Sequence, residues 1–118
     1  MNVYEIIFFT LPSGRKPVWN YIKETEEDVR GRLLAAIDVL REDGVLHEPR
    51  SKAIVGVPKL RELRVSHARG ISRIFYMVEP GPSFVLLHGF TKKTQKTPRK
   101  EIELAIARMK QYREAKHG

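Results

Sequence analysis

Five lysines and arginines lie within the thirteen residues from His88 to Lys100, together with three threonines. These basic residues are Lys92, Lys93, Lys96, Arg99 and Lys100. An apolar stretch runs directly into this basic segment and a helical pattern follows it. Clustered ammonium groups and the amides at a helix start could therefore hold a phosphate group. The alternative interpretation is a basic loop that only faces water.

Two arginines lie in segments that we expect to be neighbouring strands of one sheet. Because side chains alternate along a strand, Arg64 shares a face with Glu62, and Arg73 shares one with Phe75 and Met77. An arginine in the apolar run around Arg73 requires a reason. Either it stabilises negative charge together with the basic segment, or it lies at a sheet edge or pairs with Glu62. Pairing with Glu62 does not exclude a function.

The other residue types exclude several kinds of site. The chain has no cysteine, which excludes disulfides, cysteine-ligated zinc and a thiol nucleophile. The four histidines, His47, His67, His88 and His117, form no pair with metal-ligand spacing, and the carboxylates form no close cluster. We therefore expect neither a metal nor another cofactor. His88 lies in the basic segment, and it is a candidate for catalysis or for a structural role.

The net charge of +8 is unevenly distributed along the chain. Residues 1–58 hold eight basic and nine acidic side chains, whereas residues 88–118 hold nine basic and three acidic ones. An excess of positive charge confined to the second half of the chain favours a polyanion or an acidic protein as partner. A basic protein without a particular ligand is the alternative.

The elements that must position these residues form one domain over residues 1–118. We expect a strand over 3–10, a helix from Pro17 to about Glu24, and a second helix capped by Thr25 and ended by Gly44. Residues 45–58 read as a loop, and strands are expected over 60–65, 71–79 and 83–90. Thr97 is expected to cap a last helix that has Pro98 at its first position.

The order strand, helix, helix, three strands, helix predicts an α+β domain. Short turns between the last three strands favour an antiparallel-rich sheet, with helices mainly on one face. No stretch is long and apolar enough to span a membrane, and the N-terminus resembles no signal peptide. We therefore expect a cytoplasmic protein that does not enter a membrane.

Three segments closely resemble the phage-derived, HigB-like branch of the RelE/ParE toxins of type II toxin–antitoxin systems. The segments are Leu-Arg-Glu-Leu-Arg-Val at 60–65, Ser-Arg-Ile-Phe-Tyr at 72–76 and Leu-Leu-His-Gly-Phe-Thr-Lys-Lys-Thr-Gln-Lys-Thr-Pro at 86–98. The last segment is the most specific, and the resemblance extends over nearly the whole chain. It implies a RelE-like β-α-α-β-β-β-α domain and a ribosome-dependent endoribonuclease that cuts mRNA in the A site.

The resemblance also implies roles for single residues. Arg73 occupies the position of the strand arginine that contacts the scissile phosphate in RelE-type enzymes. Arg64 and Glu62 occupy two positions where some members carry lysines, so only one of the two positive charges is kept. Lys92 and Lys93 fall at the family's basic pair. The tyrosine that some members carry at the start of the last helix has no clear counterpart.

This set of residues suits RNA cleavage without a metal, in which the 2′-hydroxyl attacks the adjacent phosphate. The candidate catalytic residues are Arg64, Arg73, Lys92, Lys93, Glu62 and His88. Candidates for binding RNA or the ribosome are Arg61, Lys96, Arg99 and Lys100. The general base stays open: a lysine whose pKa is lowered by neighbouring cations, Glu62 or His88.

Two other functions remain open, namely a non-catalytic gyrase poison of the ParE type and a plain basic RNA-binding module. With five Phe, four Tyr and one Trp, mostly at expected core positions, the chain offers few rings for stacking on bases. The expected partners are the ribosome, mRNA and a cognate antitoxin with an acidic surface and a helix-turn-helix domain. The antitoxin would cover the basic site or the early helices, and operator DNA would be bound only through the complex.

Overall fold

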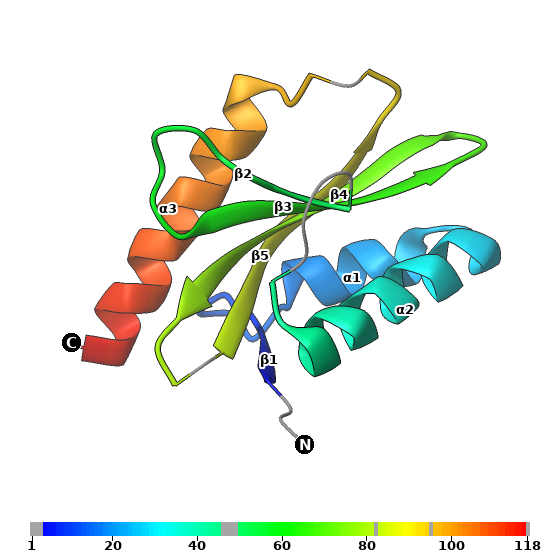
Figure 1. Cartoon of the computed structure of the whole chain (residues 1–118). Coiled ribbons are helices and arrows are strands. Elements are labelled where there is room, and N and C mark those ends of the chain that lie inside the picture. Colours follow the sequence, from blue (N-terminus) through cyan, green and yellow to red (C-terminus); the bar gives the residue numbers. More distant parts are fainter. Residues whose placement is uncertain (1–3, 46–49, 82, 95, 118) are drawn as a thin grey trace.

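The computed structural model describes residues 4–45, 50–81, 83–94 and 96–117 (Figure 1). Its elements in chain order are β1 (Glu5–Phe8), α1 (Pro17–Glu24), α2 (Glu27–Asp43), β2 (Ser51–Ala53), β3 (Leu60–His67), β4 (Gly70–Glu79), β5 (Ser83–Lys92) and α3 (Arg99–His117). The α+β class is confirmed. No helix within these residues combines the length and apolar character needed to cross a membrane.

The five strands form one mixed sheet in the order β1-β5-β4-β3-β2. β3, β4 and β5 are antiparallel neighbours, as the short turns predict, whereas β1 pairs with β5 in parallel. The expectation of a loop throughout residues 45–58 is wrong, because β2 pairs with β3 as a short antiparallel edge strand. The buried hydroxyl of Ser51 lies 2.7 Å from the hydroxyl of Tyr76, which anchors this strand to the sheet.

Two of the described helices, α1 and α2, cover one face of the sheet, and α3 covers the other. On one face α1 and α2 pack against alternate residues of the strands, with a core of Val18, Ile22, Val29, Leu33, Ile37, Leu40, Leu63, Ile74, Tyr76, Phe84 and Leu86. On the opposite face, here called the α3 face, α3 packs against Phe9, Leu60, Phe75, Met77, Val85, Leu87 and Phe90 through Ala105 and Met109.

Two of the predicted helix caps are also wrong. α2 begins after Glu26, and the hydroxyl of Thr25 instead donates to the carbonyl of Ile22 at the end of α1. α3 begins at Arg99, beyond Pro98, and the hydroxyl of Thr97 points to the sheet. Gly44 ends α2 with φ 82°, as expected for a residue that must enter the left-handed region.

A β-bulge interrupts the pairing of β4 with β5. Phe75 pairs with His88 and Tyr76 pairs with Leu86, so Leu87 is the extra residue. Leu86 therefore lies on the α1–α2 face, whereas His88 and Phe90 lie with Arg73 and Phe75 on the α3 face. Bulges re-aim side chains in this way, frequently beside functional sites.

Candidate functional site

The candidate site lies on the α3 face, where β3, β4 and β5 pass beneath the start of α3. Apolar residues fill most of this face, but its far end carries Glu62 and Arg64 from β3, Arg73 from β4 and His88 from β5. We call this region the polar end of the sheet. The strand alternation in the sequence predicts the shared face of Glu62 with Arg64, and of Arg73 with Phe75.

Arg73 is fully buried, and its charge is balanced by the equally buried Glu62. The Arg73 Nε lies 2.8 Å from Glu62 Oε2, and the two side chains are 0% and 1% exposed. The guanidinium also lies over the ring of Phe90, 5.7 Å from its centroid. Burial lowers the pKa of Arg73 and the Glu62 charge opposes that shift, yet an arginine stays protonated at any ordinary pH. The pairing that the sequence left open is therefore present.

Arg64 lies directly opposite Arg73 in the register of β3 and β4. Two positive charges at such a position repel each other, and Glu62 lies where it can offset that repulsion. The Arg64 Nε is 3.7 Å from Glu62 Oε1, so the two arginines approach different oxygens of one carboxylate. The Arg64 side chain is 17% exposed, which leaves it accessible from outside, unlike Arg73.

The connection from β5 to α3 is hydrogen-bonded to the carboxylate of Glu62. The hydroxyl of Thr97 lies 3.0 Å from both oxygens of Glu62, to which it donates. Arg73 donates from Nη2 to the backbone carbonyl of Thr94. This pair of contacts holds the connection above Arg73 and Glu62. The role of Thr97 was missed because a threonine before a proline and a basic helix start reads as a helix cap.

His88 is held by two residues of α3 that sequence reasoning did not assign to the site. Its Nε2 lies 2.6 Å from Glu101 Oε1, and its Nδ1 lies 3.4 Å from Arg108 Nη1. Burial lowers the pKa of His88, against the opposing effect of Glu101. The ring is therefore neutral at pH 7, donating from Nε2 and accepting at Nδ1. Both nitrogens are engaged, so this contact positions α3.

The cations of the basic segment lie at the end of β5, in the connection to α3 and at the start of α3. Lys92 ends β5, Lys93 and Lys96 follow it, and Arg99 and Lys100 begin α3; all five are exposed. Arg99 pairs with Glu103 one turn along the helix, at 3.3 Å. Arg61 is not among this group. It lies on the α1–α2 face, where its Nε is 3.1 Å from the hydroxyl of Ser51.

A second polar network supports the end of β5 from the α1–α2 face. Tyr21 packs flat on Gly89, where an added Cβ would lie 2.5 Å from its Cδ2. The Tyr21 hydroxyl lies 2.6 Å from Thr91 Oγ1, which is 3.2 Å from Ser72 Oγ, which in turn is 2.9 Å from His67 Nε2. Gly89, in the basic segment, is therefore needed because a side chain at this position would collide with Tyr21.

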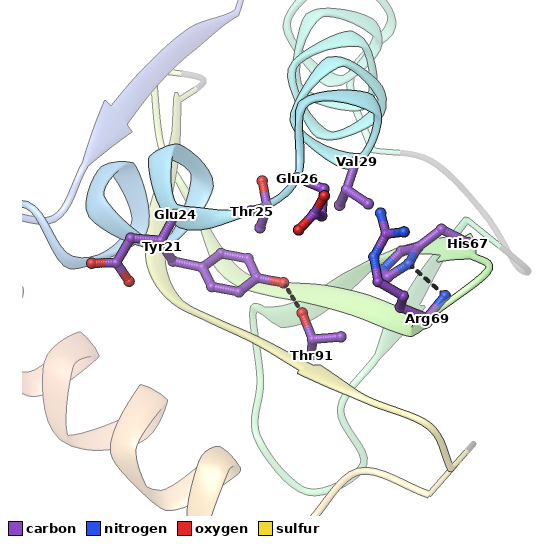
Figure 2. A pocket seen from close by; sticks show the side chains of 8 residues that line it. All are labelled: Tyr21, Glu24, Thr25, Glu26, Val29, His67, Arg69 and Thr91. Carbon is purple, nitrogen blue, oxygen red and sulfur yellow. Dashed lines mark hydrogen bonds between the residues drawn. The ribbon is translucent and has the colours of Figure 1, made fainter.

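Figure 2 shows the open cavity of about 340 Å³ that this network borders, between the α1–α2 junction and the hairpin of β3 and β4. His67 accepts from the amide of Arg69 at Nδ1, at 3.2 Å. Burial lowers the pKa of His67, and the charge of Arg69 lowers it further. These contacts tie the hairpin end to β5 at Thr91, the residue before Lys92.

The site offers cations and bound carboxylates rather than metal ligands. Within the part of the chain that the structure describes, no three His, Asp or Glu side chains gather as a metal ion would require. His47 lies outside the described residues, as does the side chain of His117. One partly exposed arginine beside a buried carboxylate, together with the exposed lysines that end and follow β5, can bind a phosphodiester and stabilise added negative charge on it.

A comparison with protein families identifies relatives of the chain. The model of the family described as "Phage derived protein Gp49-like (DUF891)" matches residues 20–110, which include α2, β2 to β5 and most of α1 and α3. No curated protein matches the chain. The match covers the basic segment, the polar end and the second polar network. The protein therefore belongs to the Gp49-like family of phage-derived proteins, a family of RelE/HigB-like toxins.

Proposed function

We propose that the protein is the HigB-like toxin of a type II toxin–antitoxin system and inhibits translation by cutting mRNA in the ribosomal A site. The observation that carries this proposal is the polar end, where the partly exposed Arg64 pairs with a buried carboxylate, close in the chain to the exposed cations that end β5 and begin α3. A phosphodiester is the ligand that this arrangement suits best. The membership in a toxin family supports the same function.

The proposed reaction needs no metal. The 2′-oxygen attacks the adjacent phosphorus and its proton passes to a base, while the bond from phosphorus to the 5′-oxygen breaks and that oxygen takes a proton from an acid. The products are a 2′,3′-cyclic phosphate and a 5′-hydroxyl. Because the site is poor in conventional bases, the ribosome would contribute by holding the 2′-hydroxyl in line.

The contacts divide the candidate residues into two groups. Arg64 and the lysines Lys92 and Lys93 can reach RNA, so we assign phosphate binding to Arg64 and proton transfer to the lysine pair. Arg73 and Glu62 are buried against each other and act by positioning Arg64. His88 acts by positioning α3 through its hydrogen bond to Glu101.

The remaining cations would track the RNA backbone. Lys96, Arg99 and Lys100 are exposed beside the polar end and suit contacts to mRNA or ribosomal RNA. Arg61 lies on the opposite face, so nothing in its surroundings supports the RNA-binding role expected for it. We propose that a cognate antitoxin with an acidic surface neutralises the toxin, and that this complex alone binds operator DNA through a helix-turn-helix domain.

Induced expression followed by pulse labelling tests the function. We expect protein synthesis to stop first and cellular mRNA to be cut with 5′-hydroxyl ends. If DNA synthesis fails first while mRNA stays intact, the protein is a gyrase poison. If neither process fails, a plain RNA-binding module is the better assignment.

A matched pair of variants tests the site. Arg64→Ala should lower cleavage on purified ribosomes by roughly 10²–10³-fold, the usual cost of removing one group that stabilises transition-state charge. Arg113→Ala removes another partly buried arginine, located near the C-terminal end of α3, and should leave cleavage unchanged. Thermal melting of both variants separates a lost contact from a lost fold. Equal cleavage by the two variants would remove Arg64 from the mechanism.

A further inference from the structure

The two edges of the sheet differ in how they are protected. β2 forms one edge and is short, with the exposed Lys52 at its centre and the exposed Ala53 after it. Such features prevent a sheet edge from pairing with another chain. β1 forms the other edge with Glu5-Ile6-Ile7-Phe8, and its three apolar side chains are partly buried. Neither a proline nor a lysine protects this second edge.

The backbone of β1 is available on its outer side at the amides of Ile6 and Phe8, whereas the Phe8 carbonyl accepts from the hydroxyl of Thr10 and the preceding Tyr4 amide donates to the carbonyl of Arg41. The amide of Phe9 donates to the carbonyl of Leu86 at 2.9 Å, so the odd-numbered residues of β1 bond to β5. Because bonding residues alternate along a parallel pair, the amides of Ile6 and Phe8 point outward. Among the described residues, no strand pairs with this edge.

An apolar groove runs beside the same edge. Its volume is about 740 Å³, and it lies between β1 with the chain that leaves it and the C-terminal turns of α3. Ile7, Phe9 and Pro12 form one wall, and Tyr112 and Ala115 form the other. A row of apolar side chains could enter this groove while its backbone pairs with β1, because alternate side chains of a strand point to one side.

Cations border this groove. The guanidinium of Arg108 lies over the ring of Phe9 at 5.8 Å, and the ammonium of Lys116 lies over the ring of Tyr112 at 5.9 Å. Burial lowers the pKa of Arg108, and the positive charge of Arg15 lowers it further, which places Arg15 near the same wall. Glu114, which also lines the groove, carries a negative charge. Charge complementarity therefore favours an acidic occupant over a second copy of this basic chain.

We propose that the outer edge of β1 and the groove beside it receive an extended, acidic segment of a partner protein, which adds a sixth strand to the sheet. Alternate residues of the segment are apolar and fill the groove, while its carboxylates meet Arg15 and Lys116. Main-chain hydrogen bonds supply affinity, and the groove supplies specificity. Only the identification of this partner as the antitoxin rests on the function proposed above.

A library of displayed random twelve-residue peptides, selected on the purified full chain, tests the surface without knowledge of the partner. We expect the selected peptides to be acidic and to alternate apolar with polar residues. Ala115→Glu places a carboxylate in the groove and should weaken their binding by roughly tenfold or more. Ala107→Glu makes the same change at another exposed alanine of α3, outside the groove, and should leave binding unchanged.

Hydrogen exchange identifies the mode of binding. A selected peptide should slow exchange at the outward amides of Ile6 and Phe8 as well as near Tyr112. Protection near Tyr112 alone would indicate a helix in the groove and overturn strand addition. Failure to select acidic peptides, equal binding by both variants, or self-association through β1 would each overturn the proposal. None of these readouts depends on RNA cleavage, so the two proposals can fail separately.

Discussion

Replacement of Arg73 by methionine tests the view that this arginine is a buried counter-charge. Methionine is of comparable length but carries no charge, so Arg73→Met leaves the Glu62 carboxylate buried without its closest partner, at 1% exposure. Removing one member of such a pair costs about 3–5 kcal/mol of unfolding free energy. Arg64 lies at 3.7 Å and Thr97 remains bonded to Glu62, so we expect the lower end of that range.

The cost translates into a measurable melting shift. A chain of 118 residues has an unfolding entropy of roughly 0.25 kcal/mol per kelvin, so each kcal/mol lowers the midpoint by about 4 °C. At the lower end of the range, we expect Arg73→Met to melt roughly 12 °C below the unaltered protein. The double variant Glu62→Leu with Arg73→Met should recover most of this loss, because an apolar pair of similar volume leaves no buried charge.

Urea unfolding followed by circular dichroism gives the free energies, and Arg99→Met is the control. Arg99 is also paired with a glutamate, but both partners are exposed, so its loss should change the stability by less than about 1 kcal/mol. If Arg73→Met melts within a few degrees of the unaltered protein, or if the double variant is weaker still, then Glu62 and Arg73 are not a mutually dependent buried pair.

Three further predictions follow from the surrounding contacts. Gly89→Ala should cost roughly 1–3 kcal/mol in urea unfolding because of its close approach to Tyr21; the cost should shrink when Tyr21 is also alanine, and an unchanged cost would contradict the packing. Since burial lowers the pKa of His88 below its ordinary value of about 6.5, the unfolded chain binds the proton first. The contribution of neutral His88 to the free energy of unfolding should therefore be complete above about pH 6.5 and should be lost as the pH falls. The free energy of unfolding should fall less steeply with decreasing pH in His88→Asn than in the unaltered protein, and equal slopes for the two proteins would refute this. Lys93→Ala should reduce mRNA cleavage, whereas Lys110→Ala, at another exposed lysine, should not, and equal rates would exclude Lys93 from the site.

Alternation along the strands was sufficient to predict which residues of the site share a face. Side chains two residues apart in a strand point to the same face, so Glu62 shares a face with Arg64, and Arg73 shares one with Phe75. The possible pairing of Arg73 with Glu62 could be stated as well, because an arginine in an apolar strand needs a counter-charge. Nothing in the local sequence indicates how deeply the pair is buried, since that depends on where α3 lies.

The contacts of the polar end that sequence reasoning missed come from α3 and from the connection before it. Glu101 and Arg108 meet His88 across a chain separation of 13 and 20 residues, and Thr97 meets Glu62 across 35. In the sequence, Glu101 and Thr97 fit a helix start equally well, and local capping patterns cannot exclude a distant partner. The position of α3 on the opposite face from α2 also depends on packing, because both helices present only one apolar stripe.

The bulge at Leu87 makes this region sensitive to changes in chain length. If β5 kept all its residues but alternated regularly beyond Leu86, His88 and Phe90 would project toward α1 while Gly89 and Thr91 would face α3; the extra residue Leu87 prevents this. Substitutions in β5 leave this alternation intact, whereas the gain or loss of one residue beyond the bulge exchanges the two faces for all residues that follow it. Natural variation in this segment should therefore consist of substitutions, and length changes should be confined to the turns that flank β4.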